Sequence, residues 1–125
     1  MLASIAAISA GASLGALLRW WLALRLNGVF AGMPLGTLAA NLVGGYCIGL
    51  AIAWLAAHPE LPPQVRLFVV TGLLGGLTTF STFSAEVVHQ LQTAQFGWAI
   101  ATAFAHLGGS LLLTAAGIAT FRWLA

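Results

Sequence analysis

Polar residues recur at helical intervals inside the long apolar stretches of this sequence. In the last stretch they are spaced by four positions and so share one face of a helix: Thr102, His106, Ser110 and Thr114. Hydroxyl and imidazole groups offer hydrogen-bond donors without a permanent charge. A strong cation site would need several carboxylates, whereas Glu86 is the one acid within the apolar stretches. The donor-rich face therefore favours contact with an anion or a neutral solute.

The other apolar stretches carry similar polar faces. Serine and threonine hydroxyls are often satisfied by carbonyls of their own helix. The amide of Asn41, the carboxylate of Glu86 and the guanidinium of Arg19 need other partners in a membrane. Two interpretations stay open, namely a polar track that a solute follows and an internal network of hydrogen bonds between helices. The aligned residues are Gly11, Gly15 and Arg19; Thr37, Asn41 and Gly45; and Thr79, Thr82, Phe83 and Glu86, with Phe80 at the margin.

The helices that must position these groups follow from the composition. The chain has 125 residues, of which 61% are hydrophobic and 5% are charged. A soluble domain of this composition would expose large apolar patches and aggregate. Four stretches are long and apolar enough to cross a bilayer as helices: residues 2–26, 35–57, 65–91 and 96–124. We expect an all-α integral membrane protein in which residues 1–125 form one domain, with the first stretch retained rather than cleaved as a signal peptide.

Several other classes of protein are disfavoured by the same composition. A net charge of +2 is too small for a nucleic-acid-binding surface, so we expect no nucleic-acid partner. Cys47 is alone, and the three histidines do not match the spacing of a zinc site. The sequence contains no nucleophile–base pair and no phosphate-binding loop, so we expect no enzymatic activity.

The distribution of positive charge bears on the orientation of the chain. Arg66 and Arg122 flank the side that carries the termini, whereas Arg25 and the deeper Arg19 lie toward the other side. This bias is too weak to determine one orientation by the positive-inside rule. We infer that the chain inserts both ways and forms an antiparallel homodimer. A single orientation set by other signals is the alternative.

Glycines at four-residue spacing predict close contacts between helices. The pairs are Gly11/Gly15, Gly45/Gly49 and Gly72/Gly76. The third stretch contains "GGLTTFSTFSAE" at residues 75–86, and Gly75–Gly76 predicts a break of that helix in mid-membrane. Carbonyls freed by such a break could hold a small hard cation such as Na⁺.

Phe80 and Phe83 follow this break, three positions apart on one helix. The edge of a phenyl ring carries partial positive charge. Ring edges facing a narrow path could contact an anion weakly and release it, as conduction requires. The alternative is that the two rings only pack between helices.

The motifs of this chain resemble those of the Fluc (CrcB) fluoride channel family along essentially the whole length. The similar segments are "GASLGALLRW" (11–20), "GTLAANLVGGYCIG" (36–49) and "TGLLGGLTTFSTFSAE" (71–86). The resemblance implies a multi-pass protein of a prokaryotic plasma (inner) membrane. It also implies an antiparallel, dual-topology homodimer with two pores that passively export fluoride from the cytoplasm.

The resemblance also implies roles for individual residues. Phe80 and Phe83 would be the pore phenylalanines, and Asn41 the pore-lining amide. The carbonyls of Gly75 and Thr78 would bind a central, structural Na⁺. His106 lies on the polar face of its own stretch, and we place it at the pore wall as a hypothesis. The hydroxyls near the fluoride path would belong to Ser81, Thr82 and Ser110. Arg19 and Glu86 would lie toward the pore ends.

Two other functions remain as alternatives at this point. A proton-coupled cation exporter of the small multidrug-resistance type is also short, four-spanning and dual in topology. Such an exporter needs a membrane-embedded carboxylate in its first helix, and residues 2–26 contain no acid. A non-transporting assembly subunit would tolerate replacement of Phe80 and Phe83.

Overall fold

The computed structural model describes residues 1–125, and every regular element in it is a helix. Four helical runs are long and apolar enough to cross a membrane, as the sequence predicts: Leu2–Leu26, Leu35–Ala57, Pro63–Gln92 and Phe96–Leu124. The elements in chain order are α1 (Leu2–Leu26), α2 (Leu35–Ala57), α3 (Pro63–Arg66), the π-helix η1 (Leu67–Leu74), α4 (Gly75–Leu77), α5 (Phe80–Gln92) and α6 (Phe96–Leu124).

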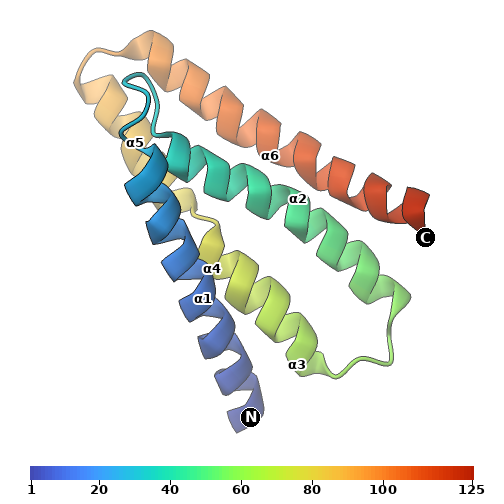
Figure 1. The fold of residues 1–125 in the computed structure, drawn as a ribbon. Coiled ribbons are helices and arrows are strands. Elements are labelled where there is room, and N and C mark those ends of the chain that lie inside the picture. Colours follow the sequence, from blue (N-terminus) through green and yellow to red (C-terminus); the bar gives the residue numbers. More distant parts are fainter.

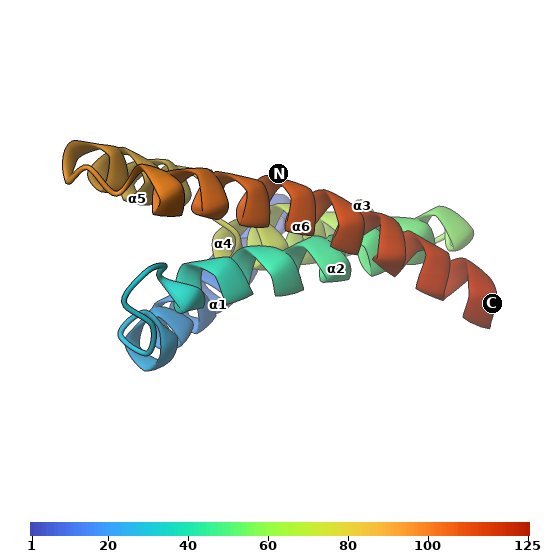
Figure 2. The ribbon, with the colours of Figure 1, turned by 90° about the horizontal axis from the view of Figure 1, so that it is seen from above.

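The helices form two packed pairs joined through α2. Helix α6 runs along α2, and α1 runs along the segment from α3 to α4 (Figure 1). Figure 2 shows the same arrangement from above, with α5 beside the first part of α6. The two termini lie at the end that also carries the loop between α2 and α3 (Figure 1). The loop of residues 27–34, here called the α1–α2 loop, lies at the opposite end with the turn before α6.

The glycine pairs predicted from the sequence all lie at helix contacts. A Cβ atom on Gly11 or Gly15 would collide with backbone atoms of η1 and α4, including the carbonyl oxygen of Leu73. A Cβ on Gly76 would lie 2.5 Å from the carbonyl oxygen of Ala12. Helix α1 and the third span therefore approach each other closely at glycines on both sides. A Cβ on Gly49 would collide with the Thr114 carbonyl oxygen of α6, so the remaining pair sets the α2–α6 contact.

The third span is broken, but not where its glycines suggest. Gly75 is helical, with φ −65° and ψ −36°. The extended residues are Thr78, with φ −83° and ψ 154°, and Thr79, with φ −150° and ψ 120°. We call Thr78–Thr79 the break. Gly76 is needed for contact with α1, whereas the backbone turns at Thr79 because its side chain caps α5 by accepting the Thr82 N–H at 3.1 Å.

Candidate functional site

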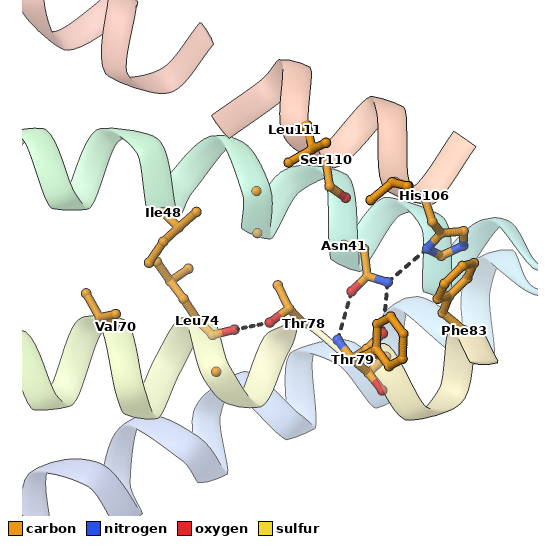
Figure 3. Close-up of a pocket in the computed structure, with 15 residues that line it drawn as sticks. Asn41, Ile48, Val70, Leu74, Thr78, Thr79, Phe83, His106, Ser110 and Leu111 are labelled. Carbon is orange, nitrogen blue, oxygen red and sulfur yellow. Dashed lines mark hydrogen bonds between the residues drawn. The ribbon is translucent and has the colours of Figure 1, made fainter. Parts of the chain in front are cut away.

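The side chain of Asn41 holds the break against α2. Its Oδ1 accepts the backbone N–H of Thr79 at 2.8 Å, and its Nδ2 donates to the Thr79 carbonyl at 3.0 Å (Figure 3). One amide thus satisfies a donor and an acceptor that the broken helix leaves without helical partners. These two bonds also determine the orientation of the amide, since only Oδ1 can accept from an N–H.

His106 extends this arrangement into α6. Its Nδ1 lies 2.9 Å from Asn41 Nδ2, which can only donate, so Nδ1 accepts (Figure 3). The ring proton is therefore on Nε2, and His106 is neutral in this arrangement. The ring is 3% exposed, and its Nε2 has no hydrogen-bond partner. A buried N–H donor without a partner is the kind of group that a polar ligand or ordered water satisfies.

Aromatic rings flank the imidazole. Phe83 stacks on His106 with ring centroids 4.5 Å apart. Phe80 meets Phe83 edge to face, with centroids 5.6 Å apart and planes at 71°. The ring of Phe80 is 79% exposed on the single chain. The two phenylalanines thus form a continuous aromatic surface that begins at His106 and ends at the molecular surface.

A cavity of about 380 Å³ lies between α2, α6 and the third span, and we call it the central cavity. It brings together seven of the predicted site residues. The remaining lining is mainly aliphatic and comes from η1, α2, α6 and Thr79 of the break, as the close-up shows (Figure 3). The seven residues are Asn41, Gly75, Thr78, Phe80, Phe83, His106 and Ser110.

The other predicted site residues lie outside the lining of the central cavity. Ser81 is exposed, and its hydroxyl is 3.3 Å from that of Thr79. Thr82 accepts from the Thr79 hydroxyl at 3.1 Å, so both hydroxyls belong to the cap of α5. Arg19 donates from Nε to the Gly76 carbonyl at 3.0 Å. Its guanidinium group therefore lies against the backbone just before the break.

Glu86 has a partner that was not assigned from the sequence. Thr37 donates its hydroxyl to Glu86 Oε1 at 2.6 Å, and the second carboxylate oxygen is buried without a partner. Thr37 is 3% exposed. The only signal in the sequence was its place on the polar face with Asn41, because residues 37 and 86 belong to different spans.

Some residues on the polar face of α6 fit a polar track for a solute, and others form hydrogen bonds between helices. His106 and Ser110 line the central cavity, as a polar track requires. Thr114 instead donates to the Gly45 carbonyl of α2 at 3.0 Å, which is a hydrogen bond between helices. Thr102 is completely buried, and its hydroxyl has no partner.

Two backbone carbonyls at the break lose their helical partners. The Thr79 N–H, which would donate to Gly75 in an unbroken helix, donates to Asn41. The Thr82 N–H, which would donate to Thr78, donates to the Thr79 side chain. Gly75 and Thr78 both line the central cavity. Neutral carbonyl oxygens of this kind are ligands for hard cations such as Na⁺.

Comparison with known proteins places the chain in a family. A family model described as "CrcB-like protein, Camphor Resistance (CrcB)" matches residues 6–118. The chain belongs to the CrcB family. Its relatives include proteins named fluoride-specific ion channel FluC. The one from Chromobacterium violaceum is 60% identical over 121 residues, which are 97% of this chain and 96% of the relative.

Other CrcB relatives agree over the same length. The protein of that name from Nitrosospira multiformis is 57% identical over 98% of this chain and 95% of its own length. The one from Paraburkholderia xenovorans is 55% identical over 97% of this chain and 96% of its own length. With four membrane-length helices and bacterial relatives, this CrcB chain is a multi-pass membrane protein of a prokaryote.

Proposed function

We propose that this CrcB-family protein is a passive fluoride channel that exports fluoride and lowers its concentration in the cytoplasm. The observation that carries the proposal is the lining of the central cavity, where phenyl rings and a buried, unpartnered N–H of His106 occur without any arginine or lysine. The names of its full-length relatives specify fluoride as the ion. Residues 1–125 act as one domain without enzymatic activity or a nucleic-acid partner, in the plasma (inner) membrane.

The chemistry of this lining suits conduction rather than tight binding. A fluoride ion that loses part of its hydration shell needs donors along its path. His106 Nε2–H and the hydroxyl of Ser110 supply neutral donors, and the edges of Phe80 and Phe83 supply weak positive potential. A permanent positive charge at this place would hold the anion too firmly for release. Asn41 orients His106 so that its proton points away from the amide.

The assembly that we propose is an antiparallel, dual-topology homodimer. The weak charge bias supports insertion in both orientations. The exposed ring of Phe80, which lines the central cavity, supports completion of the path by a second copy. In that dimer, Gly75 and Thr78 of both copies would hold a structural Na⁺ through their carbonyl oxygens, and the ion would supply positive charge that joins the two broken helices.

Fluoride efflux from proteoliposomes tests the proposed function. Vesicles loaded with potassium fluoride are treated with a potassium ionophore, and external fluoride is followed with an electrode. The wild-type protein is expected to release fluoride rapidly, and Phe83→Ile is expected to abolish release while the oligomer still forms. Uptake of a lipophilic cation driven by a proton gradient, without fluoride efflux, would support the exporter instead. Retained efflux in Phe83→Ile would contradict the assignment of the path.

A further inference from the structure

The α1–α2 loop is tied to the start of α2 by Asn27. Its Oδ1 accepts the backbone N–H of Thr37 at 3.1 Å. Helix α2 begins at Leu35, and its N-cap residue Pro34 provides no side-chain cap. Asn27 therefore supplies from outside the helix the acceptor that a capping residue normally provides. The contact is tight, because a Cβ on Gly36 would lie 2.7 Å from the same oxygen.

This cap acts on the residue that holds Glu86. Thr37 donates its backbone N–H to Asn27 Oδ1 and its hydroxyl to Glu86 Oε1, the latter at 2.6 Å. The carboxylate has no other hydrogen-bond partner, since Oε2 is buried and unpaired. The position of this carboxylate therefore depends on where the first turn of α2 places the Thr37 hydroxyl.

A second tie joins the same loop to α5. Gln90 lies one helical turn after Glu86, is 5% exposed and donates from Nε2 to the Gly32 carbonyl at 3.1 Å. Gly32 packs directly on the indole of Trp98, where an added Cβ would lie 2.5 Å from Cε2. Phe30 of the loop meets Trp98 edge to face, with centroids 5.2 Å apart. The loop is thus anchored to both helices of the α5–α6 hairpin.

We propose that Asn27 and Gln90 are positioning residues that hold the Glu86 carboxylate in one orientation, through Thr37 and the α1–α2 loop. They so keep this charge, at the end of the anion path, from turning toward the central cavity. The proposal rests on the proposed function. A carboxylate released from Thr37 could turn toward the path, where it would repel fluoride in surroundings of low dielectric constant. The effect of removing either tie must then depend on the charge of Glu86, which a purely structural tie would not require.

Single variants measure the two ties separately. Asn27→Ala removes the acceptor, and the initial fluoride efflux rate is expected to fall roughly fivefold, the factor that one net hydrogen bond contributes to an equilibrium. Asn27→Asp keeps an acceptor for the Thr37 N–H and is expected to restore most of the rate. Gln90→Met approximately preserves the side-chain volume but removes the donor to Gly32, and we expect a similar fall in the efflux rate. Gln92→Met is the matched control at an exposed position and is expected to leave efflux unchanged.

The decisive measurement combines each tie with Glu86→Gln, which removes the charge. Asn27→Ala and Gln90→Met are expected to lower efflux in the wild-type background and to have no further effect in the Glu86→Gln background. Equal loss in both backgrounds would show a structural role and overturn the proposal, as would abolition of efflux by Glu86→Gln alone. If Asn27→Ala fails to fold, Gln90→Met carries the same comparison. Retained efflux in Phe83→Ile contradicts the proposed path separately, because that variant leaves both ties intact.

Discussion

The imidazole of His106 stacks on the phenyl ring of Phe83, with ring centroids 4.5 Å apart and planes at 28°. The contact joins α6 to the helix that follows the break, and it leaves the Nε2 edge of the imidazole without a protein partner. Because Asn41 occupies Nδ1, the two nitrogens of His106 have separate roles. One nitrogen holds the ring in place, and the other is buried without a hydrogen-bond partner.

Replacement of His106 by two amides separates these roles. Asparagine can place an acceptor near the position of Nδ1, whereas glutamine can place a donor near that of Nε2. If the Nε2–H contacts fluoride, His106→Gln is expected to keep more efflux than His106→Asn, by roughly the fivefold that one hydrogen bond supplies. The measurement is the initial fluoride efflux rate from vesicles that contain equal amounts of reconstituted dimer. A higher rate for His106→Asn would contradict the role assigned to Nε2.

The exposed ring of Phe80 gives a second prediction. Phe80→Ile keeps an apolar side chain but removes the ring edge, so we expect fluoride efflux to be abolished without loss of the dimer. Phe104→Ile is the matched control, because Phe104 is 75% exposed on α6 and does not line the central cavity. Efflux and cross-linked dimer are measured for both. Equal efflux from the two variants would favour a packing role for Phe80.

The clamp between Asn41 and Thr79 gives a prediction about stability. Asn41→Leu leaves the part-buried Thr79 N–H and carbonyl without their partners, at a cost of about 1 kcal/mol for each group. We expect a lower melting temperature together with loss of efflux. Thermal unfolding in detergent, followed by circular dichroism, checks the first part. An unchanged melting temperature would mean that water replaces the amide at the break.

The close contact of α1 with α4 predicts that Gly15 tolerates no side chain. A Cβ at this position would collide with the Leu73 carbonyl oxygen and lie 2.7 Å from the Leu77 nitrogen. Since backbone atoms on both sides cannot yield cheaply, Gly15→Ala is expected to destabilise the protein by about 1–3 kcal/mol. Gly97→Ala is the control, because nothing lies within 4 Å of its Cβ position, and alanine favours the helix. A neutral result at Gly15 would show that the helices can separate.

The carbonyls of Gly75 and Thr78 predict a dependence on sodium. Replacement of Na⁺ by a large organic cation is expected to weaken the dimer, since carbonyl oxygens facing one another across an interface would lack a counter-charge. The fraction of dimer at low protein concentration, measured by cross-linking in the two salts, checks this. The same dimer fraction in both salts would count against a structural Na⁺.

Much of the fold could be predicted from local pattern. The four spans follow from apolar length, and the three glycine pairs indicated where helices approach, because a small side chain serves close packing in any pairing. The position of the break was predicted three residues too early. Gly75 and Gly76 lower helix stability in isolation, yet Gly75 is helical and Gly76 packs on Ala12 of α1. The capping hydroxyl of Thr79 determines where α5 begins.

Part of the lining of the central cavity could be predicted from the sequence, but the contacts of its residues could not. Asn41, Phe80, Phe83, His106 and Ser110 were singled out by residue type and spacing, and all five line the central cavity. Arg19 and Glu86 were both expected toward the pore ends, and this stays a prediction. The pattern did not indicate their partners, which are the Gly76 carbonyl for Arg19 and the Thr37 hydroxyl for Glu86. The contribution of Asn27 and Gln90 carried no signal in the sequence, since neither amide belongs to a recognisable pattern and their partners lie in other elements.

The sequence by itself determined that the chain resides in a membrane, that it crosses four times and which faces carry its polar groups, because these properties depend on local composition and helical period. Only the tertiary structure decided the partners. Asn41 meets Thr79 across 38 positions and His106 across 65. Such pairs depend on how helices pack, and a buried polar group takes whichever partner that packing brings within hydrogen-bond distance.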